Sequence, residues 1–168
     1  MNKLTGAQTK VAAYEYTTQE PLSGIWLQRG IHVQVIDTPS ISSPSIQSRL
    51  YGLMRNSDVF VIVMDLAIDP VGQFNITVRH LSDWGFNLIN GVRTSQEMEP
   101  HMYKPTVVVG SRADMDGALD GFQELENCIS DQYPIVMTSS EEQYGLDDLA
   151  KEVFNALGLI RIYPKSPR

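Results

Sequence analysis

The chain has 168 residues, of which 42% are hydrophobic and 20% are charged, a size and composition typical of one globular domain with a sizeable core. The formal net charge of −7 argues against a surface that coats nucleic acid, and no apolar run approaches the length of a membrane span. The N-terminal residues lack the apolar core of a signal peptide, and Cys128 is the only cysteine. We therefore expect a cytoplasmic protein with no membrane contact.

The first predicted elements are the two strands of a β-hairpin. Residues 23–29 (SGIWLQR) and 31–37 (IHVQVID) alternate apolar and polar side chains and are joined at Arg29 and Gly30. Later strands are predicted by short, almost continuously apolar runs at 59–65, 106–109 and 134–137. Runs of this kind are typical of parallel strands that are covered on both faces.

Helical patterns separate these strands. Residues 45–56 fill one gap, and residues 118–130 place Leu119, Phe122, Leu125 and Ile129 on one stripe. Residues 145–158 form a third amphipathic segment, which stops at Gly158. In the long connection 66–105 we expect one helix around 76–90, followed by a mobile loop at 91–103. The order predicts a three-layer α/β domain with a mostly parallel sheet and an antiparallel edge hairpin.

Polar residues stand at the end of each predicted strand. Asp37 ends the second hairpin strand, residues 111–114 follow the 106–109 strand, and residues 138–140 follow the 134–137 strand. The carboxyl ends of parallel strands share one edge of the sheet, so these loops should converge on one crevice. Thr17 and Thr18, just before the hairpin, are placed to cover that crevice as a flap. Taken singly, each residue also fits a turn or a helix cap.

The set of motifs resembles the G domain of P-loop GTPases of the TRAFAC class, and within them the Obg and DRG (developmentally regulated GTP-binding) families. Residues 8–22 resemble the switch I segment, DTPS (37–40) stands at the D-x-P-G motif, SRAD (111–114) at N-K-x-D, and TSS (138–140) at the SA motif. The resemblance implies a G domain over residues 1–158, followed at 159–168 by a linker or the beginning of a TGS-like strand.

This resemblance implies roles for particular residues. Thr18 would ligate a Mg²⁺ ion through its hydroxyl, and Asp37 would hold a water molecule bound to that ion. Thr17 and Thr18 would belong to the switch segment that contacts the γ-phosphate. Asp114 would accept N–H bonds from guanine, and Ser139 and the N–H of Ser140 would support the base oxygen. The implied ligands are GTP or GDP with Mg²⁺, and the implied partner is the ribosome or the translation machinery.

Several positions depart from the family pattern. The phosphate-loop string G-x-x-x-x-G-K-[ST] does not occur in the 168 residues. Ser40 replaces the glycine of D-x-P-G, Ser111 replaces the Asn of N-K-x-D, and Arg112 replaces its Lys, whose packing on the base a guanidinium can reproduce by stacking. Two interpretations remain: a truncated or degenerate GTPase domain with weak or no hydrolysis, or a non-catalytic interaction module derived from a G domain.

In the family, the strand that precedes the phosphate loop lies in the sheet between the strands that correspond to segments 31–37 and 59–65, and we expect this strand and the phosphate loop to be missing here. Each buried backbone group left unpaired there costs on the order of 1–3 kcal/mol. Either the two strands close up, or another chain donates a strand, or the sequence is a piece of a longer protein. We therefore expect a homo-oligomer, a strand-donating partner or a marginally folded chain.

Overall fold

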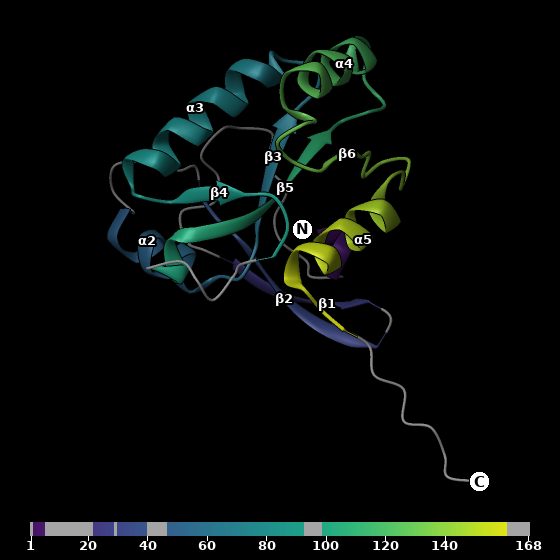
Figure 1. Ribbon diagram of the computed structural model, residues 1–168. Helices are drawn as coiled ribbons and strands as arrows, with labels where there is room; N and C mark the ends of the chain where they lie inside the picture. The colour runs from purple at the N-terminus through teal and green to yellow at the C-terminus, as the bar shows by residue number, and fades with distance from the viewer. Residues whose placement is uncertain (1, 6–21, 29, 40–46, 93–98, 161–168) are drawn as a thin grey trace, which may run out of the picture.

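The computed structural model describes residues 2–5, 22–28, 30–39, 47–92 and 99–160 (Figure 1). Its helices and strands, in chain order, are α1 (Asn2–Thr5), β1 (Leu22–Gln28), β2 (Ile31–Asp37), α2 (Gln47–Asn56), β3 (Phe60–Asp65), α3 (Pro70–Asp83), β4 (Asn87–Ile89), a 3-10 helix (Pro100–Met102), β5 (Tyr103–Ser111), α4 (Ala118–Ile129), β6 (Ile135–Met137) and α5 (Leu146–Leu157). The predicted alternation of strands and helices is confirmed.

The larger sheet is parallel throughout and is organised around β5. Strand β3 pairs with β5 along its whole length, from Phe60 opposite Thr106 to Asp65 opposite Ser111. Strand β6 pairs with the same stretch of β5 and therefore lies on the other side of it, while β4 pairs with the first residues of β5. The prediction of a mostly parallel sheet is confirmed.

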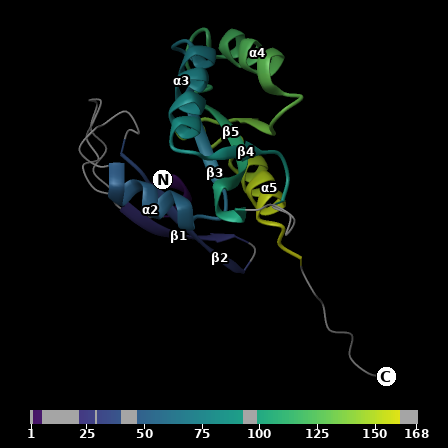
Figure 2. The same ribbon diagram turned by 60° about the vertical axis from the view of Figure 1, so that its left-hand side comes forward.

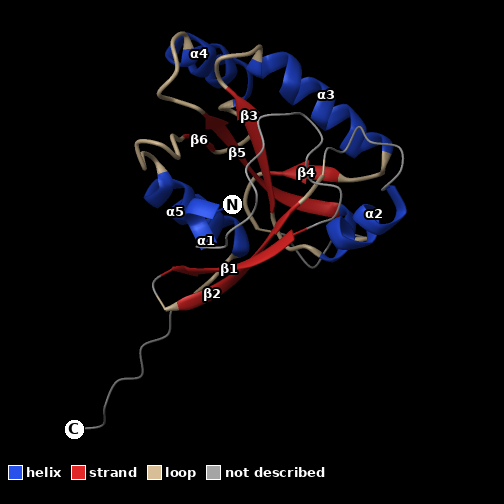
Figure 3. Ribbon diagram, turned by 180° about the vertical axis from the view of Figure 1, so that it is seen from behind, coloured by secondary structure: helices blue, strands red, loops and turns tan. Residues whose placement is uncertain are grey.

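The hairpin β1–β2 forms a separate, two-stranded antiparallel sheet, with Trp26 opposite Val33. Within the described residues β2 does not pair with β3, so direct closure of these two strands is not observed. Figures 2 and 3 both place α3 and α4 at the top of the molecule and the hairpin at the bottom, with the parallel sheet between them.

Two apolar clusters occupy the two faces of β5, because successive strand residues point to opposite faces. Val108 belongs to the first cluster, with residues of α2, β3, α3 and α4. Val107 and Val109 belong to the second cluster, whose other buried members are Trp26, Val136, Leu149, Ala150, Val153 and Ala156. The α5 stripe predicted from the sequence therefore packs on β5 and β6 and also meets the hairpin through Trp26.

Strand β3 is covered on one face only, which corrects the prediction for segment 59–65. Phe60, Ile62 and Met64 are buried in the first cluster, whereas Val61 and Val63 are 43% and 56% exposed. The run is continuously apolar, and no described element covers its second face. Strand β5 behaves as predicted, since residues 104–110 are all buried.

The connection between β3 and β5 differs from the prediction. The helix begins at Pro70 and ends at Asp83, so it starts earlier than expected, and residues 87–89 form a strand instead of its last turn. The start is explained by Asp69, whose carboxylate accepts the N–H of Gly72 at 2.9 Å, followed by proline at the first helical position. In the expected loop, residues 93–98 lie outside the described part of the chain, and Pro100–Met102 form the 3-10 helix.

Strand β5 begins at Tyr103, three residues before the predicted start at 106, and it carries a buried lysine. Lys104 is 0% exposed, and its Nζ donates to the carbonyl oxygens of Arg55 and Ser57 at 2.8 Å each. The same ammonium group lies 5.4 Å from the ring centroid of Phe60. It satisfies carbonyl groups at the C-terminal end of α2, and these contacts offset its desolvation.

In α4 the predicted stripe is shifted. Leu119 is 59% exposed, while Ala118, Gly121, Leu125 and Ile129 are buried. Gly121 takes the inward position because a Cβ there would overlap the backbone oxygen of Leu66. A close approach of two backbones thus decides which face of α4 points inward, and hydrophobic periodicity alone does not reveal it.

Candidate nucleotide-binding site

The loops that follow β5 and β6 are held together by backbone hydrogen bonds. The N–H of Thr138 donates to the carbonyl of Gly110 at 2.7 Å, and the N–H of Ala113 donates to the carbonyl of Thr138 at 3.1 Å. Residues 111–114 and 138–140 therefore form one continuous rim at the carboxyl end of the sheet. This is the convergence that the sequence predicted for these two loops.

Asp114 and Ser139 are in direct contact across this rim. The buried Ser139 hydroxyl donates to Oδ1 of Asp114 at 2.5 Å and accepts the N–H of Glu142 at 3.1 Å. The hydrogen bond from Ser139 is the main cause that lowers the pKa of Asp114, with smaller contributions from its own backbone and from the positive charge of Arg112. The rim thus presents an exposed, ionised carboxylate, which is an acceptor of hydrogen bonds only.

Ser111 and Arg112 tie the same loop to the end of β3. The Ser111 hydroxyl donates to the carbonyl of Met64 at 2.8 Å, and the guanidinium of Arg112 lies 2.6 Å from Oδ2 of Asp65. Arg112 has a φ of 61°, a left-handed conformation that is uncommon outside Gly, Asn and Asp. The loop therefore contacts both neighbouring strands, β3 through Ser111 and Arg112 and β6 through Asp114.

Asp65 is the site residue that the sequence analysis missed. It ends an apolar strand run just as Asp37 does, and its position at the same sheet edge as Ser111 was available as a signal. Its backbone N–H donates to the side chain of Gln73 at 3.0 Å, which fixes the end of β3 against α3.

The remaining predicted residues are only partly described. Asp37 is the last residue of β2 and half-buried, and within the described residues no hydrogen bond or ion pair links it to the 111–114 or 138–140 loops. Ser140 is exposed beside Ser139. Thr17, Thr18 and Ser40 lie outside the described residues.

Of the two residues predicted to bind magnesium, only Asp37 lies among the described residues. Its carboxylate supplies the hard oxygen atoms that Mg²⁺ prefers. The described residues contain no group of three or more His, Cys, Asp or Glu side chains able to hold a metal ion. Asp37 is thus compatible with a magnesium role without forming a site by itself.

A family model described as "50S ribosome-binding GTPase" matches residues 1–103. The chain belongs to this family. GTPase Obg of Borrelia garinii subsp. bavariensis is 21% identical over 160 residues, which cover 92% of the chain and 45% of the relative. Developmentally-regulated G-protein 3 of Arabidopsis thaliana is 31% identical over 93 residues, which cover 52% of the chain and 25% of the relative. The chain therefore spans less than half the length of these relatives.

Solved structures agree on the fold. Era of Aquifex aeolicus bound to GDP.AlF4- aligns with a TM-score of 0.65 at 18% identity, over 99% of the chain and 54% of the structure. NFeoB of S. thermophilus bound to GDP.AlF4- aligns with a TM-score of 0.64 at 22% identity, over 95% of the chain and 58% of the structure. The chain is an Obg/DRG-type G domain of the P-loop NTPase fold, as its motifs predicted. Among its described helices, none is long and apolar enough to cross a membrane.

Proposed function

We propose that this chain is the guanine-reading part of an Obg/DRG-type GTP-binding domain, and that Asp114 selects the base. The observation that carries the proposal is the Asp114 carboxylate, which is exposed at the rim while the buried Ser139 hydroxyl holds one of its oxygens at 2.5 Å. A carboxylate oriented in this way accepts two N–H groups from the edge of guanine. Adenine presents an acceptor at the corresponding ring nitrogen, so it would face the carboxylate with repulsion.

The other rim residues receive supporting roles. Arg112 would stack its guanidinium plane on the base, in the role of the family lysine, while Asp65 holds its charged end. Ser111 would fix the loop through Met64, and Ser139 and the N–H of Ser140 would support the base oxygen. Each of these roles follows from where the residue lies on the rim and from its position in the family motif.

On the phosphate side, Thr17, Thr18 and Asp37 are proposed to meet the γ-phosphate and Mg²⁺, which when bound would neutralise phosphate charge. The 168 residues contain no G-x-x-x-x-G-K-[ST] string, whose backbone and lysine cradle the phosphates. We therefore propose weak or no GTP hydrolysis by this chain alone, as part of a truncated or degenerate domain.

The biological setting is proposed from the relatives. The family description, "50S ribosome-binding GTPase", supports a ribosomal or translational partner, and we propose a cytoplasmic location with it. We further propose that residues 1–158 are the G-domain part and residues 159–168 a linker or the beginning of a TGS-like strand, of which 161–168 lie outside the described residues.

A second candidate function is a non-catalytic interaction module that keeps the fold. It is favoured by the replacements at Ser40, Ser111 and Arg112, which alter both the phosphate and the base motifs at once. The two candidates differ in whether Asp114 still reads guanine.

The test is a calorimetric titration of the chain with GTP and with ATP, each with Mg²⁺, in the original sequence, in Asp114→Ala and in Asp116→Ala. We expect a Kd for GTP on the order of high micromolar to millimolar, weaker binding of ATP, and loss of the preference in Asp114→Ala only. Asp116 is an exposed acid of the same loop and controls for charge. Equal affinity for both nucleotides, unchanged in Asp114→Ala, would favour the interaction module. Sub-micromolar GTP binding would contradict the proposed weakness of the phosphate half.

A further inference from the structure

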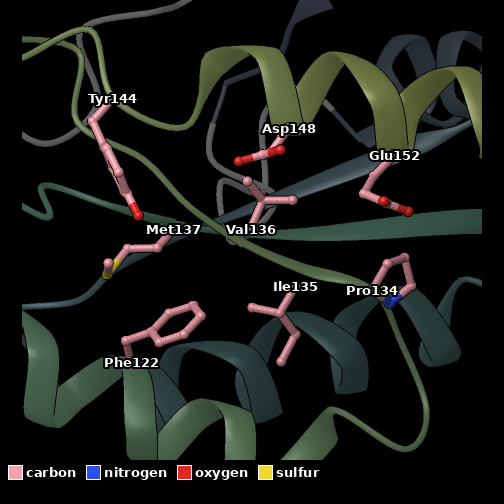
Figure 4. Close-up of a pocket in the computed structure, with 8 residues that line it drawn as sticks. All are labelled: Phe122, Pro134, Ile135, Val136, Met137, Tyr144, Asp148 and Glu152. Carbon is pink, nitrogen blue, oxygen red and sulfur yellow. The ribbon is translucent and has the colours of Figure 1, made fainter.

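A groove runs beside β6, between α4 and α5, and adjoins the rim at Tyr144, which exchanges backbone hydrogen bonds with Ser139. It has a volume of about 450 Å³ and is lined by Phe122, Pro134, Ile135, Val136, Met137, Tyr144, Asp148 and Glu152. Figure 4 shows Phe122 on the α4 side of the groove and the two carboxylates of α5 on the other, with β6 between them. The groove therefore has an apolar wall, an acidic wall and a strand as its floor.

The floor presents unused backbone groups. Strand β6 uses the carbonyl of Pro134 and the N–H of Thr138 to bond β5, at 2.9 Å and 2.7 Å. In a parallel ladder, alternate residues direct both backbone groups to the same side. Ile135 therefore directs its N–H and C=O groups, and Met137 its N–H, away from β5 toward the groove, whereas the carbonyl oxygen of Met137 lies against the backbone of Gly145. Within the described residues no strand pairs with this edge of β6.

The two walls of the groove would contact alternate side chains of an added strand. Ile135 packs toward the α4 side and the buried Val136 toward α5, so a neighbouring strand in register would alternate in the same way. Its residues beside Ile135 and Met137 would meet Phe122, and the residue beside Val136 would meet α5. One face of the occupant is thus apolar and the other faces carboxylates.

The spacing of the acids fits this geometry. Asp148 and Glu152 are four residues apart on α5, which separates them by about 6 Å along the helix. Alternate residues of an extended strand are separated by about 6.6 Å. Two basic side chains at positions i and i+2 of an added strand can therefore each meet one carboxylate.

We propose that the β6 groove binds an extended basic segment of a partner protein by strand addition, with alternating apolar and Lys or Arg residues. Backbone bonds to Ile135 and Met137 supply the affinity, and Asp148 and Glu152 select the basic face. None of the residues proposed to contact guanine lines this groove, and the proposal does not rest on nucleotide binding.

The experiment uses the 168-residue chain and the blocked peptide acetyl-Val-Lys-Val-Lys-Val-amide as the probe. Binding is followed by calorimetry and by the NMR shifts and hydrogen exchange of the backbone amides. We expect saturable binding, with new protection at the amides of Ile135 and Met137. Replacement of the peptide lysines by glutamate, or methylation of its backbone nitrogens, should abolish binding.

The protein variant Asp148→Asn with Glu152→Gln should weaken binding by about tenfold, as expected for the loss of two rim charge pairs. The matched control, Asp83→Asn with Asp120→Asn, removes the same charge from exposed positions on α3 and α4 and should leave binding unchanged. The proposal is overturned by no binding at millimolar peptide, by equal binding of the glutamate peptide, or by insensitivity to the Asp148 and Glu152 changes. Protection that appears on β3 in place of β6 would also overturn it.

Discussion

The two sides of the parallel sheet differ in how their loops are tied together and how their faces are covered, although within the described residues neither β3 nor β6 pairs with a further strand at its outer edge. At the β5–β6 side, the loops after both strands are joined by backbone bonds and by the 2.5 Å contact of Asp114 with Ser139. At the other side, β3 leaves Val61 and Val63 exposed, and within the described residues its outer edge pairs with no strand. The rim formed by residues 111–114 and 138–140 is thus held by contacts within the chain, whereas one face of β3 is left exposed. Substitutions on the two sides therefore test different contacts.

The largest effect is expected from Gly145→Ala, which breaks the well-held side. Gly145 has a φ of 73°, and a Cβ there would overlap the carbonyl oxygen of Met137, at the junction of β6 with α5. We expect destabilisation of about 3 kcal/mol or more, since the backbone must shift as well as accept a left-handed alanine. Thermal or urea unfolding measures it.

Gly117→Ala is the matched control for this change. Gly117 has a φ of 79° before α4, but a Cβ there has no neighbour within 4 Å. It should cost only about 1–2 kcal/mol, the price of the left-handed conformation. Equal losses in the two variants would show that the contact with Met137 does not matter.

The next effect concerns the open edge of β3. An exposed apolar strand edge is a template for pairing with another chain, so we expect the 168-residue chain to self-associate or to melt at low temperature with poor cooperativity. If it self-associates, Val63→Lys should shift it toward monomer, because a charge on the exposed face opposes pairing. Sedimentation equilibrium measures the mass, against 18.8 kDa for one chain.

Ile76→Lys serves as the control, because Ile76 is 60% exposed but lies on a helix, α3, where no strand can add. It should leave the association unchanged. A monomer that melts cooperatively at high temperature would contradict the expectation and show that β3 tolerates its open edge.

The contrast between the two sides also explains what the sequence could predict. Strand β5 and helix α5 were found because a continuous apolar run and an apolar stripe at helical spacing each match one burial pattern. The same rule failed for β3, since Val61 and Val63 are apolar but uncovered, and burial depends on whether another element is present to cover them. The helix α3 was placed too late because the Asp69–Pro70 start signal was outweighed by the apolar residues further along.

Within the candidate site, the position of residues 111–114 and 138–140 after parallel strands predicted that the two loops meet. It did not predict the partner of Arg112, because pairing with Asp65 depends on strand order and on the left-handed backbone at Arg112. Long-range contacts of this kind have no local sequence signature. Thr17 and Thr18 stay predictions, since they lie outside the described residues.

The smallest expected effect is on the pKa of Asp114, in the rim formed by residues 111–114 and 138–140. The Ser139 hydroxyl is the main cause of the lowered pKa of Asp114, so Ser139→Ala should raise that pKa toward its ordinary value. A depressed carboxyl pKa in the folded state favours folding above the unfolded-state pKa, and this contribution is lost as the pH falls through the folded-state value. The variant brings the folded-state pKa closer to the unfolded-state value, so its contribution above the unfolded-state pKa should be smaller than that of the original chain. Titration of the Asp114 carboxyl carbon by NMR measures the shift, with Ser140→Ala, an exposed neighbouring hydroxyl, as the control. Superimposable titration curves for the original chain and Ser139→Ala would mean that the 2.5 Å contact does not hold the carboxylate in its ionised form.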